Sequence, residues 1–149
     1  NPIWLNWFLY LAQFVSASGG ATPGSTATLS GTYNPAVVGA STNVAVSVTE
    51  PCLYMRVGEV VVVAGRVLVT PFTAGVATRL SLSLPIASSF ASSQDCRGIA
   101  GGIIQPTVPT GASLPSVTGD PSTGGAQISF LSATPSQNEL FFTFLYRVL

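Results

Sequence analysis

The side chains that could perform catalysis are few in this sequence of 149 residues. Histidine and lysine are both absent, which removes serine–histidine–aspartate triads, histidine metal ligands, Schiff-base chemistry and phosphate-binding P-loops. A pair of carboxylates, as in glycoside hydrolysis, is the remaining option. Each acidic residue, however, stands beside turn-forming residues, where carboxylates commonly accept hydrogen bonds from backbone amides. We therefore expect no enzyme, no catalytic residue and no cofactor. The five acidic residues considered for such a pair are Glu50, Glu59, Asp95, Asp120 and Glu139.

Cys52 and Cys96 are the only cysteines. Two cysteines without histidine cannot complete a zinc site with four ligands. No stretch carries the closely spaced oxygen side chains of a calcium loop, so we expect no metal site. The two cysteines could form a disulfide that closes a loop of about 45 residues, or they could remain buried thiols. The sequence leaves both alternatives open.

The five positive charges are all arginines, and they are scattered through the expected strands. Arg56 could pair with Glu59 across one turn, and Arg97 could pair with Asp95. Alternatively, some arginines could lie at contacts between subunits, where this residue type is favoured. Both interpretations stay open. The full set is Arg56, Arg66, Arg79, Arg97 and Arg147.

The overall charge is unusually low. Charged residues make up 7% of the chain and the formal net charge is zero, whereas charged residues are roughly 25% of an average protein. A neutral surface argues against binding of nucleic acid or of anionic lipid, since both require a basic patch. Soluble monomers normally keep some net charge. The composition therefore favours a subunit that shares much of its surface with neighbours.

Residues 1–15 are rich in large apolar side chains and contain no charge. Trp4, Trp7, Leu11 and Phe14 follow the spacing of a coiled-coil seam, and further apolar residues widen it. The segment is too short to cross a bilayer, and an anchor at the membrane surface would usually carry lysine or arginine. We therefore predict an N-terminal assembly helix whose contacts are made by these four residues, without membrane insertion.

The rest of the chain divides into a linker and a β domain. Residues 16–30 are rich in Gly, Ser, Thr and Ala, which is typical of a linker. From residue 31 to residue 149 the pattern is that of about eight short strands separated by Gly and Pro turns, without a second helix. These features predict an all-β domain, an antiparallel β-sandwich or a jelly-roll-like fold. The expected strands lie within residues 43–49, 52–57, 59–70, 78–84, 97–104, 126–132 and 140–149. Residues 106–125 are expected to form a long surface loop that could contain one further short strand.

Four details of the β pattern bear on packing. Gly58 is expected to supply a positive φ in a hairpin, and Gly65 indicates a bulge or a close backbone approach. Residues 60–63 are apolar on both faces, which predicts a central strand within the core. The last strand is also apolar on both faces: Leu140, Phe142, Phe144, Tyr146 and Val148 share one, and Phe141, Leu145 and Leu149 share the other.

Aromatic side chains could alternatively form a platform for sugars. Both tryptophans lie in the N-terminal segment, however, and the aromatics of the last strand have a core pattern. We expect most of the others to pack in the core as well. These are Tyr33, Tyr54, Phe72 and Phe90.

Several segments resemble a family of small β domains in the virion proteins of tailed bacteriophages. An upstream Pro-x-Trp-x-x-Trp-Phe pattern, at residues 2–8, is similar to the helix that often precedes fibre or spike domains. The resemblance implies a virion surface protein, usually a trimer attached to capsid or tail, and it carries over no catalytic residue. The matching segments are Gly31–Pro35, Tyr54–Val61, Leu84–Phe90 and Phe142–Tyr146.

The sequence thus predicts a non-enzymatic structural protein of a bacteriophage, a trimeric fibre or spike component at the particle surface. Its expected partners are two further copies of itself and other virion proteins, with host-surface glycans as candidate ligands. One alternative is a capsid cement or decoration protein. Another is a carbohydrate-binding module of a larger secreted protein.

Overall fold

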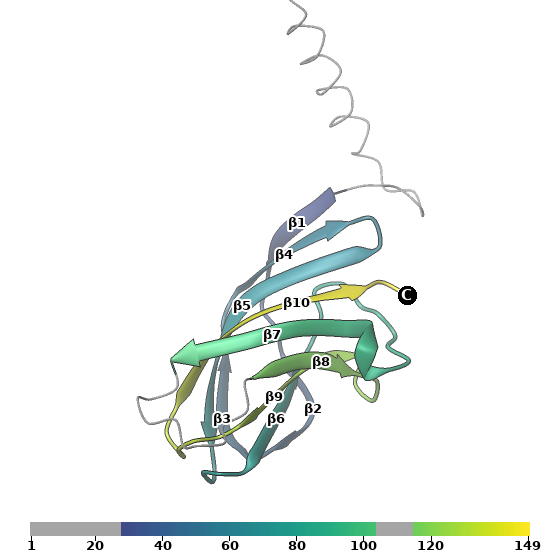
Figure 1. The fold of residues 1–149 in the computed structure, drawn as a ribbon. Coiled ribbons are helices and arrows are strands. Elements are labelled where there is room, and N and C mark those ends of the chain that lie inside the picture. The colour runs from purple at the N-terminus through teal and green to yellow at the C-terminus, as the bar shows by residue number, and fades with distance from the viewer. Residues whose placement is uncertain (1–27, 104–114) are drawn as a thin grey trace, which may run out of the picture.

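The computed structural model describes residues 28–103 and 115–149, which form one antiparallel sheet that curls around a hydrophobic core (Figure 1). The strand order is β1-β4-β5-β10-β7-β8-β9-β6-β2, with β3 paired to β5. The predicted antiparallel all-β class is confirmed, whereas the predicted helix at residues 1–15 lies outside the described residues. The elements are β1 (Thr28–Tyr33), β2 (Val37–Thr42), β3 (Val44–Thr49), β4 (Cys52–Val57), β5 (Val60–Pro71), β6 (Ala77–Leu82), the 3-10 turn η1 (Ser93–Asp95), β7 (Cys96–Ile103), β8 (Ser116–Asp120), β9 (Gly125–Leu131) and β10 (Asn138–Arg147).

The pairing of β5 with β10 forms the centre of the sheet. Its register is unbroken from Asn138 opposite Val69 to Arg147 opposite Val60. The other edge of β5 is shared, because β4 pairs with its first half and β3 with its second half. The other edge of β10 pairs with β7. β5 and β10 are therefore the two strands through which most of the other strands are connected.

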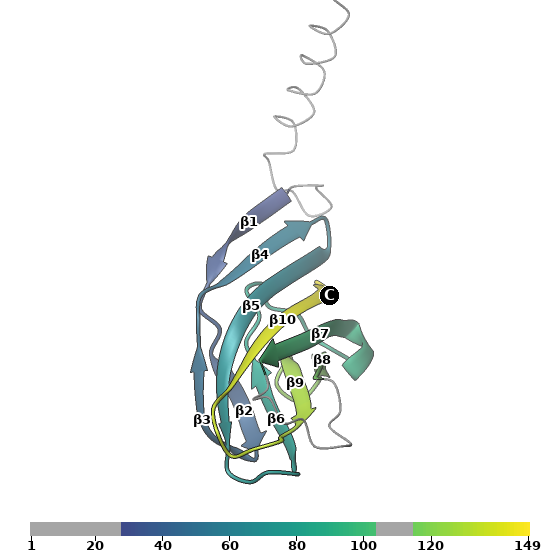
Figure 2. The same cartoon turned by 60° about the vertical axis from the view of Figure 1, so that its left-hand side comes forward.

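Asn43 lies between β2 and β3, where the chain joins opposite parts of the strand order. β2 pairs with β6, whereas β3 pairs with β5, so this connection requires the sheet to curl back on itself (Figure 2). Asn43 has a φ of 56°, which asparagine tolerates better than most residues. Its Nδ2 donates to the Thr73 carbonyl at 2.9 Å, to Thr78 Oγ1 at 2.9 Å and to Ser132 Oγ at 3.2 Å. The side chain thereby connects three segments at one end of the sheet.

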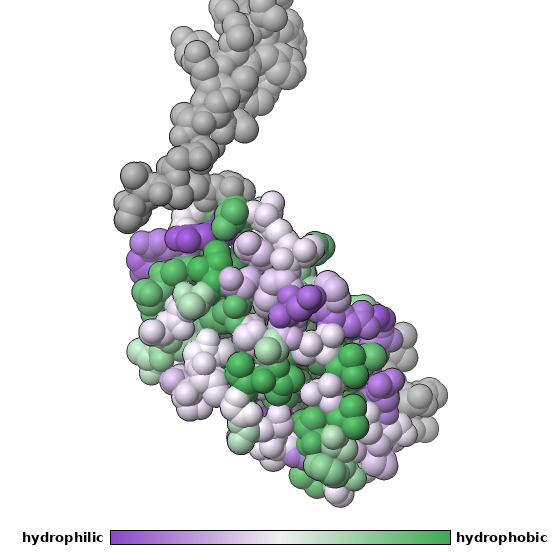
Figure 3. Space-filling model, turned by 180° about the vertical axis from the view of Figure 1, so that it is seen from behind, coloured by the Kyte–Doolittle hydropathy of each residue, from purple (hydrophilic) through white to green (hydrophobic). Residues whose placement is uncertain are grey.

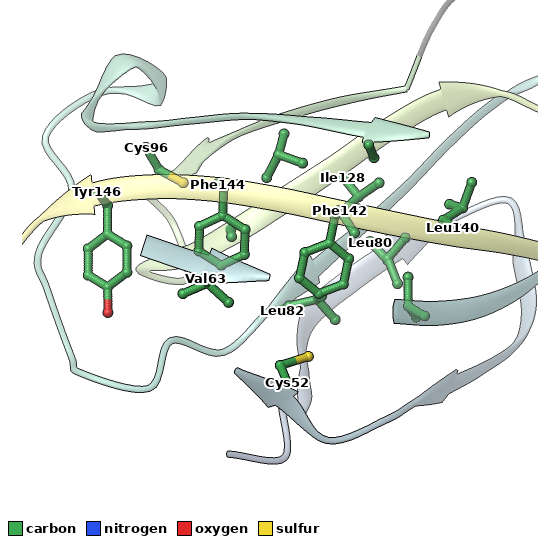
Figure 4. Close-up of a cluster of buried hydrophobic side chains, with 14 of the residues drawn as sticks. Cys52, Val63, Leu80, Leu82, Cys96, Ile128, Leu140, Phe142, Phe144 and Tyr146 are labelled. Carbon is green, nitrogen blue, oxygen red and sulfur yellow. The ribbon is translucent and has the colours of Figure 1, made fainter. Parts of the chain in front are cut away.

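The core lies on the concave face, where alternate side chains of each strand point inward. Leu140, Phe142, Phe144 and Tyr146 of β10 are at most 3% exposed, which confirms the predicted inner face of this strand. The rings of Phe142 and Phe144 stack at 5.8 Å. Side chains of β6 and β9 lie across the core from them, among them Leu80, Leu82 and Ile128 (Figure 4).

The segment between β6 and η1 is fastened to one end of the core by Tyr146. Its hydroxyl donates to the Ile86 carbonyl at 2.7 Å and accepts from the Ile86 amide at 3.2 Å. The Phe90 ring meets Tyr146 edge-on at 5.9 Å. Ser88 Oγ also donates to the Arg147 carbonyl at 2.9 Å. Residues 86–90 therefore cover core side chains that the strands alone would leave open.

Two strands, β1 and β2, and two register shifts, in β2 and in β3, were not predicted. β1 and β2 were not among the expected strands, and β1 begins slightly before the predicted start of the β domain at Gly31. In β3 the register shifts between Val44 and Val46. Beyond this shift Val46 and Val48 are 53% and 45% exposed. The alternating valines of β3, Val44, Val46 and Val48, therefore do not form one buried face.

The structure confirms the prediction for Gly58 and decides between the two alternatives for Gly65. Gly58 has a φ of 60° in the β4–β5 turn, as predicted. At Gly65 the register of β5 with β10 runs without a bulge, and the pairing of β5 with β4 ends one residue earlier, at Ala64. A Cβ atom at this position would lie 2.1 Å from Cys52 Sγ and 3.0 Å from the Phe142 ring. Of the two alternatives, close approach is therefore the correct one.

We predict that Gly65→Ala lowers the free energy of unfolding by about 1–3 kcal/mol, because the new methyl group overlaps the Cys52 side chain. Adding Cys52→Ala should make the double variant less destabilised than the sum of the two single changes. Gly101→Ala is the matched control, since a Cβ there meets nothing within 4 Å. Urea unfolding at one protein concentration measures all four variants. Additive effects at positions 52 and 65 would contradict this account.

Candidate functional site

The four residues predicted to make the assembly contacts, Trp4, Trp7, Leu11 and Phe14, lie outside the described residues. The described part of the chain contains the five predicted acidic candidates, both cysteines and all five arginines. Their surroundings show which chemistry the domain can support.

Glu50 and Glu139 come together, but Arg66 joins them. Arg66 Nε donates to Glu50 Oε2 at 3.1 Å, while Nη2 binds Glu50 and Nη1 binds Glu139. The hydrogen bonds, to Glu50 first and then to Glu139, raise the pKa of the guanidinium above its usual value. All three side chains are partly exposed. The two carboxylates therefore share one arginine and form an ion cluster with a net charge of −1 at one end of the sheet.

The structure does not form either of the two ion pairs considered from the sequence, Arg56 with Glu59 and Arg97 with Asp95. Glu59 pairs with Arg147, and Nε of Arg147 donates to its Oε2 at 2.7 Å. Arg56 Nε instead donates to the Gly58 carbonyl at 2.6 Å. Arg97 donates to Gln94 Oε1 at 3.0 Å. The cause is strand pairing: Arg147 lies opposite Val60, next to Glu59, and is thereby brought close to a residue far away in the sequence.

The two aspartates hold turns, as their sequence context predicts. Asp95 Oδ2 accepts from the amides of Ala91 and Ser92 at 2.8 and 2.7 Å and completes a capping box at η1. Asp120 Oδ1 accepts from the Ser122 amide at 3.0 Å, and its Oδ2 accepts from the Ser81 hydroxyl at 2.7 Å. Both carboxylates are thus committed to hydrogen bonds with their own chain.

Cys52 and Cys96 are free thiols, both fully buried. They lie on β4 and β7, with β5 and β10 between them, so three strand spacings of about 4.8 Å each, together with an offset along the strands, separate them (Figure 4). A disulfide requires Cα atoms within about 7 Å. Burial raises the pKa of both thiols, and that of Cys96 reaches about 12. Of the two alternatives, the structure has buried, unreactive thiols.

Among residues 28–103 and 115–149, no three Cys, Asp or Glu side chains gather into a metal-binding group. In the same ranges no helix has the length and apolar character needed to span a membrane.

The largest unexplained feature is the convex side of the sheet, where β4, β5, β10 and β7 carry exposed apolar side chains. Residues 60–63 were expected to be buried on both faces. Val61 and Val63 are fully buried, but Val60 is 44% exposed, so this prediction is wrong for the outer face. We call this surface the outer apolar face. Its members are Leu53, Met55, Val57, Val60, Val62, Ala64, Ile99, Phe141 and Leu145.

A shallow groove crosses the outer apolar face between β7 and β10. Ile99, Gly101, Phe141 and Thr143 are among the residues that line it. Gly101 lies opposite Phe141 and leaves open space where a side chain would stand. Ile99 is 75% exposed beside it. The groove is therefore apolar and open, and it can accept a protruding apolar side chain.

The charged side chains of β10 stand at the two ends of this face. On the outer side of the strand, Glu139 and Arg147 flank Phe141, Thr143 and Leu145. Each end charge is paired within the chain, one with Arg66 and the other with Glu59. The middle of the outer apolar face is therefore neutral.

The opposite side of the molecule also shows apolar patches among weakly polar residues and few strongly hydrophilic groups (Figure 3).

The aromatic residues considered for sugar binding have mixed positions. Phe90 is 6% exposed, and Tyr33 and Tyr54 are partly buried with their rings edge-on at 6.1 Å, as core packing predicts. Phe72 is 69% exposed, and Phe141, which has a core pattern in the sequence, is 50% exposed. The sequence did contain a signal for the outer apolar face, since β10 and the first half of β5 are apolar on both faces.

No family model matches this chain, and no curated protein or solved structure shows significant similarity to it.

We predict a pKa of about 2 for Asp120. Partial burial alone would raise it, but hydrogen bonds from Ser122, Ser81 and Thr123 outweigh that effect. Because the folded pKa lies below the unfolded value of about 3.9, Asp120 stabilises the fold above about pH 4, and this contribution is lost as the pH falls towards 2. Asp120→Asn should lower Tm by a few degrees at pH 6, with the difference shrinking towards pH 2. NMR titration of the Asp120 carboxyl carbon measures the pKa directly, and a value near 4 would refute the prediction.

Proposed function

We propose that this chain is a non-enzymatic structural subunit of a tailed-bacteriophage virion, a trimeric fibre or spike component at the particle surface. The observation that carries the proposal is the outer apolar face. β5 and β10 are central strands with apolar side chains on both faces, but within the described residues only the inner face is covered. Exposed apolar surface of this extent is typical of protein interfaces. A neighbouring subunit would cover it.

The segments that resemble phage virion domains support this proposal because they pack together. Tyr33, from the first segment, meets Tyr54 of the second at 6.1 Å. Ile86 and Phe90, from the third, both contact Tyr146 of the last. The resemblance thus covers one connected part of the domain rather than scattered pieces.

The jelly-roll-like architecture expected for such a domain belongs to the proposal as well. The curled sheet provides the two walls that a jelly roll requires, because β6 and β9 lie across the core from β5 and β10 (Figure 4). The core between these walls is filled by side chains from both.

In the proposed trimer, the N-terminal segments associate through Trp4, Trp7, Leu11 and Phe14. Residues 16–27 then connect this assembly to the β domains. Tethering of this kind holds the three domains at high effective concentration, so weak contacts between them become populated.

The location on the particle is tested by immunogold electron microscopy of virions of a phage that encodes this chain. We expect gold label on a fibre or spike. Label over the capsid shell would replace this function by that of a cement or decoration protein. Purified particles without the chain would overturn the proposal.

We predict that the purified chain has a native mass of three 15.3 kDa subunits, also at high salt, because apolar burial rather than charge holds it together. Trp7→Asp should convert it to monomers while far-UV circular dichroism keeps its β signal, since a buried unpaired charge is costly. Asn6→Asp is the matched control, as it adds the same charge at a neighbouring polar position. Persistent trimers in Trp7→Asp would show that the segment is not the assembly element.

A further inference from the structure

We propose that the outer apolar face is the contact between the β domains of the trimer, with each domain turning this face towards a common three-fold axis. The inference rests on the trimer proposed above and adds which surface of the domain a second copy of this chain covers.

Strand registers align the exposed apolar side chains in adjacent rows. One row runs from Leu53 through Ala64 and Thr143 to Ile99. The next row runs from Met55 through Val62 to Leu145. The side chains therefore form one continuous surface across four strands. Directly paired residues stand about 5 Å apart, which leaves little room for water between them.

The extent of the face matches a subunit interface. Seven of its members are between 44% and 75% exposed, and together they present on the order of 800 Å² of surface. That exceeds the largest apolar patch of a typical monomer, and it is about the area that each partner contributes to a standard interface. The seven are Leu53, Met55, Val57, Val60, Ile99, Phe141 and Leu145.

The charges around the face favour a second copy as the occupant. Glu59 is paired with Arg147, whereas Arg66 is shared by Glu50 and Glu139, which leaves that cluster with a charge of −1. Arg97 on β7, which binds the neutral Gln94, adds one positive charge, so the face as a whole has no net charge. Two identical neutral faces do not repel each other. Arg97 borders the row of Leu145 and binds Gln94, and arginine is common at interfaces because its stem is apolar.

The curl of the sheet favours three copies over two. The face is convex, with β5 and β10 along its ridge, β4 on one slope and β7 on the other (Figures 1 and 2). Two convex faces touch over a narrow strip, whereas around a three-fold axis each slope meets the opposite slope of a neighbour. The open groove beside Gly101 lies on the β7 slope and can receive a side chain from the β4 slope.

The position of β1 agrees with this arrangement. Thr28, the first described residue, pairs with Val57 at the border of the face. The connection to the N-terminal segment therefore starts beside the proposed interface, and the twelve residues from 16 to 27 can span up to about 40 Å. Around a three-fold axis, the Thr28 residues of the three domains would therefore lie on the same side of the contact.

The test is a cysteine pair in the full-length chain, Leu53→Cys with Ile99→Cys. Within one chain these positions lie three strands apart, roughly 14 Å, and cannot form a disulfide. Across the proposed contact they meet, so mild oxidation should yield covalent trimers on a non-reducing denaturing gel. Each single substitution, and the wild-type chain with its buried thiols, should stay monomeric on the same gel.

Two further substitutions in the cysteine-pair background locate the contact. Leu145→Asp should abolish the covalent trimer, because it places a charge on the ridge of the face. Phe72→Asp is the matched control and should leave cross-linking intact, since Phe72 is also exposed but lies outside the face. Far-UV circular dichroism verifies that both variants fold.

Covalent dimers from either single substitution would overturn the proposal in favour of a two-fold contact. A lack of cross-links in a chain of trimeric mass would also overturn it, while leaving the proposed virion function intact. Conversely, covalent trimers from a chain that no virion contains would support this contact and reject the virion function.

Discussion

The continuous pairing of β5 with β10 is the interaction on which the rest of this domain depends. Its register runs from Asn138 to Arg147 without interruption, and both strands also pair on their other edges. This pairing sets which side chains face the core, because alternate residues of a strand point to opposite faces. Phe142, Phe144 and Tyr146 thereby meet the β6 and β9 side chains, and Tyr146 fastens the segment at Ile86 over one end of the core.

The same alternation sends a second set of apolar side chains outward. Strands that are apolar on both faces normally lie in sheets covered on both sides. The segment between β6 and η1 covers part of the concave side, but Leu145, Phe141 and Val60 on the convex side remain about half exposed. The sequence of these strands is therefore that of a middle layer, although the described chain supplies only one of the two neighbours. A multi-subunit assembly resolves this mismatch, because the second neighbour is then another chain.

Much of the fold could be predicted from local patterns, but the contacts of the candidate site could not. Seven strands and the Gly58 turn have signals in alternation and turn chemistry, whereas β8 lies in a segment expected to be mainly a surface loop. β1 and β2 do not, since their Ser, Thr and Gly residues resemble a linker and become strands only by pairing with β4 and β6. The partners of Arg66, Glu59 and both cysteines depend on strand order, which the sequence does not reveal. The outer apolar face was visible as a pattern, but its exposure was not.

The low charge of the chain is consistent with a subunit that associates through an apolar surface. Three of the five arginines lie on the outer side of β5, β10 and β7: Arg66 and Arg147 form ion pairs within the chain, and Arg97 binds Gln94. Exposed pairs of this kind contribute about 0–1 kcal/mol each to stability, so their main consequence is a neutral surface between them. Association through such a surface gains little from electrostatic steering and depends on apolar burial, which salt does not screen. The proposed subunit contact would therefore hold over a wide range of ionic strength.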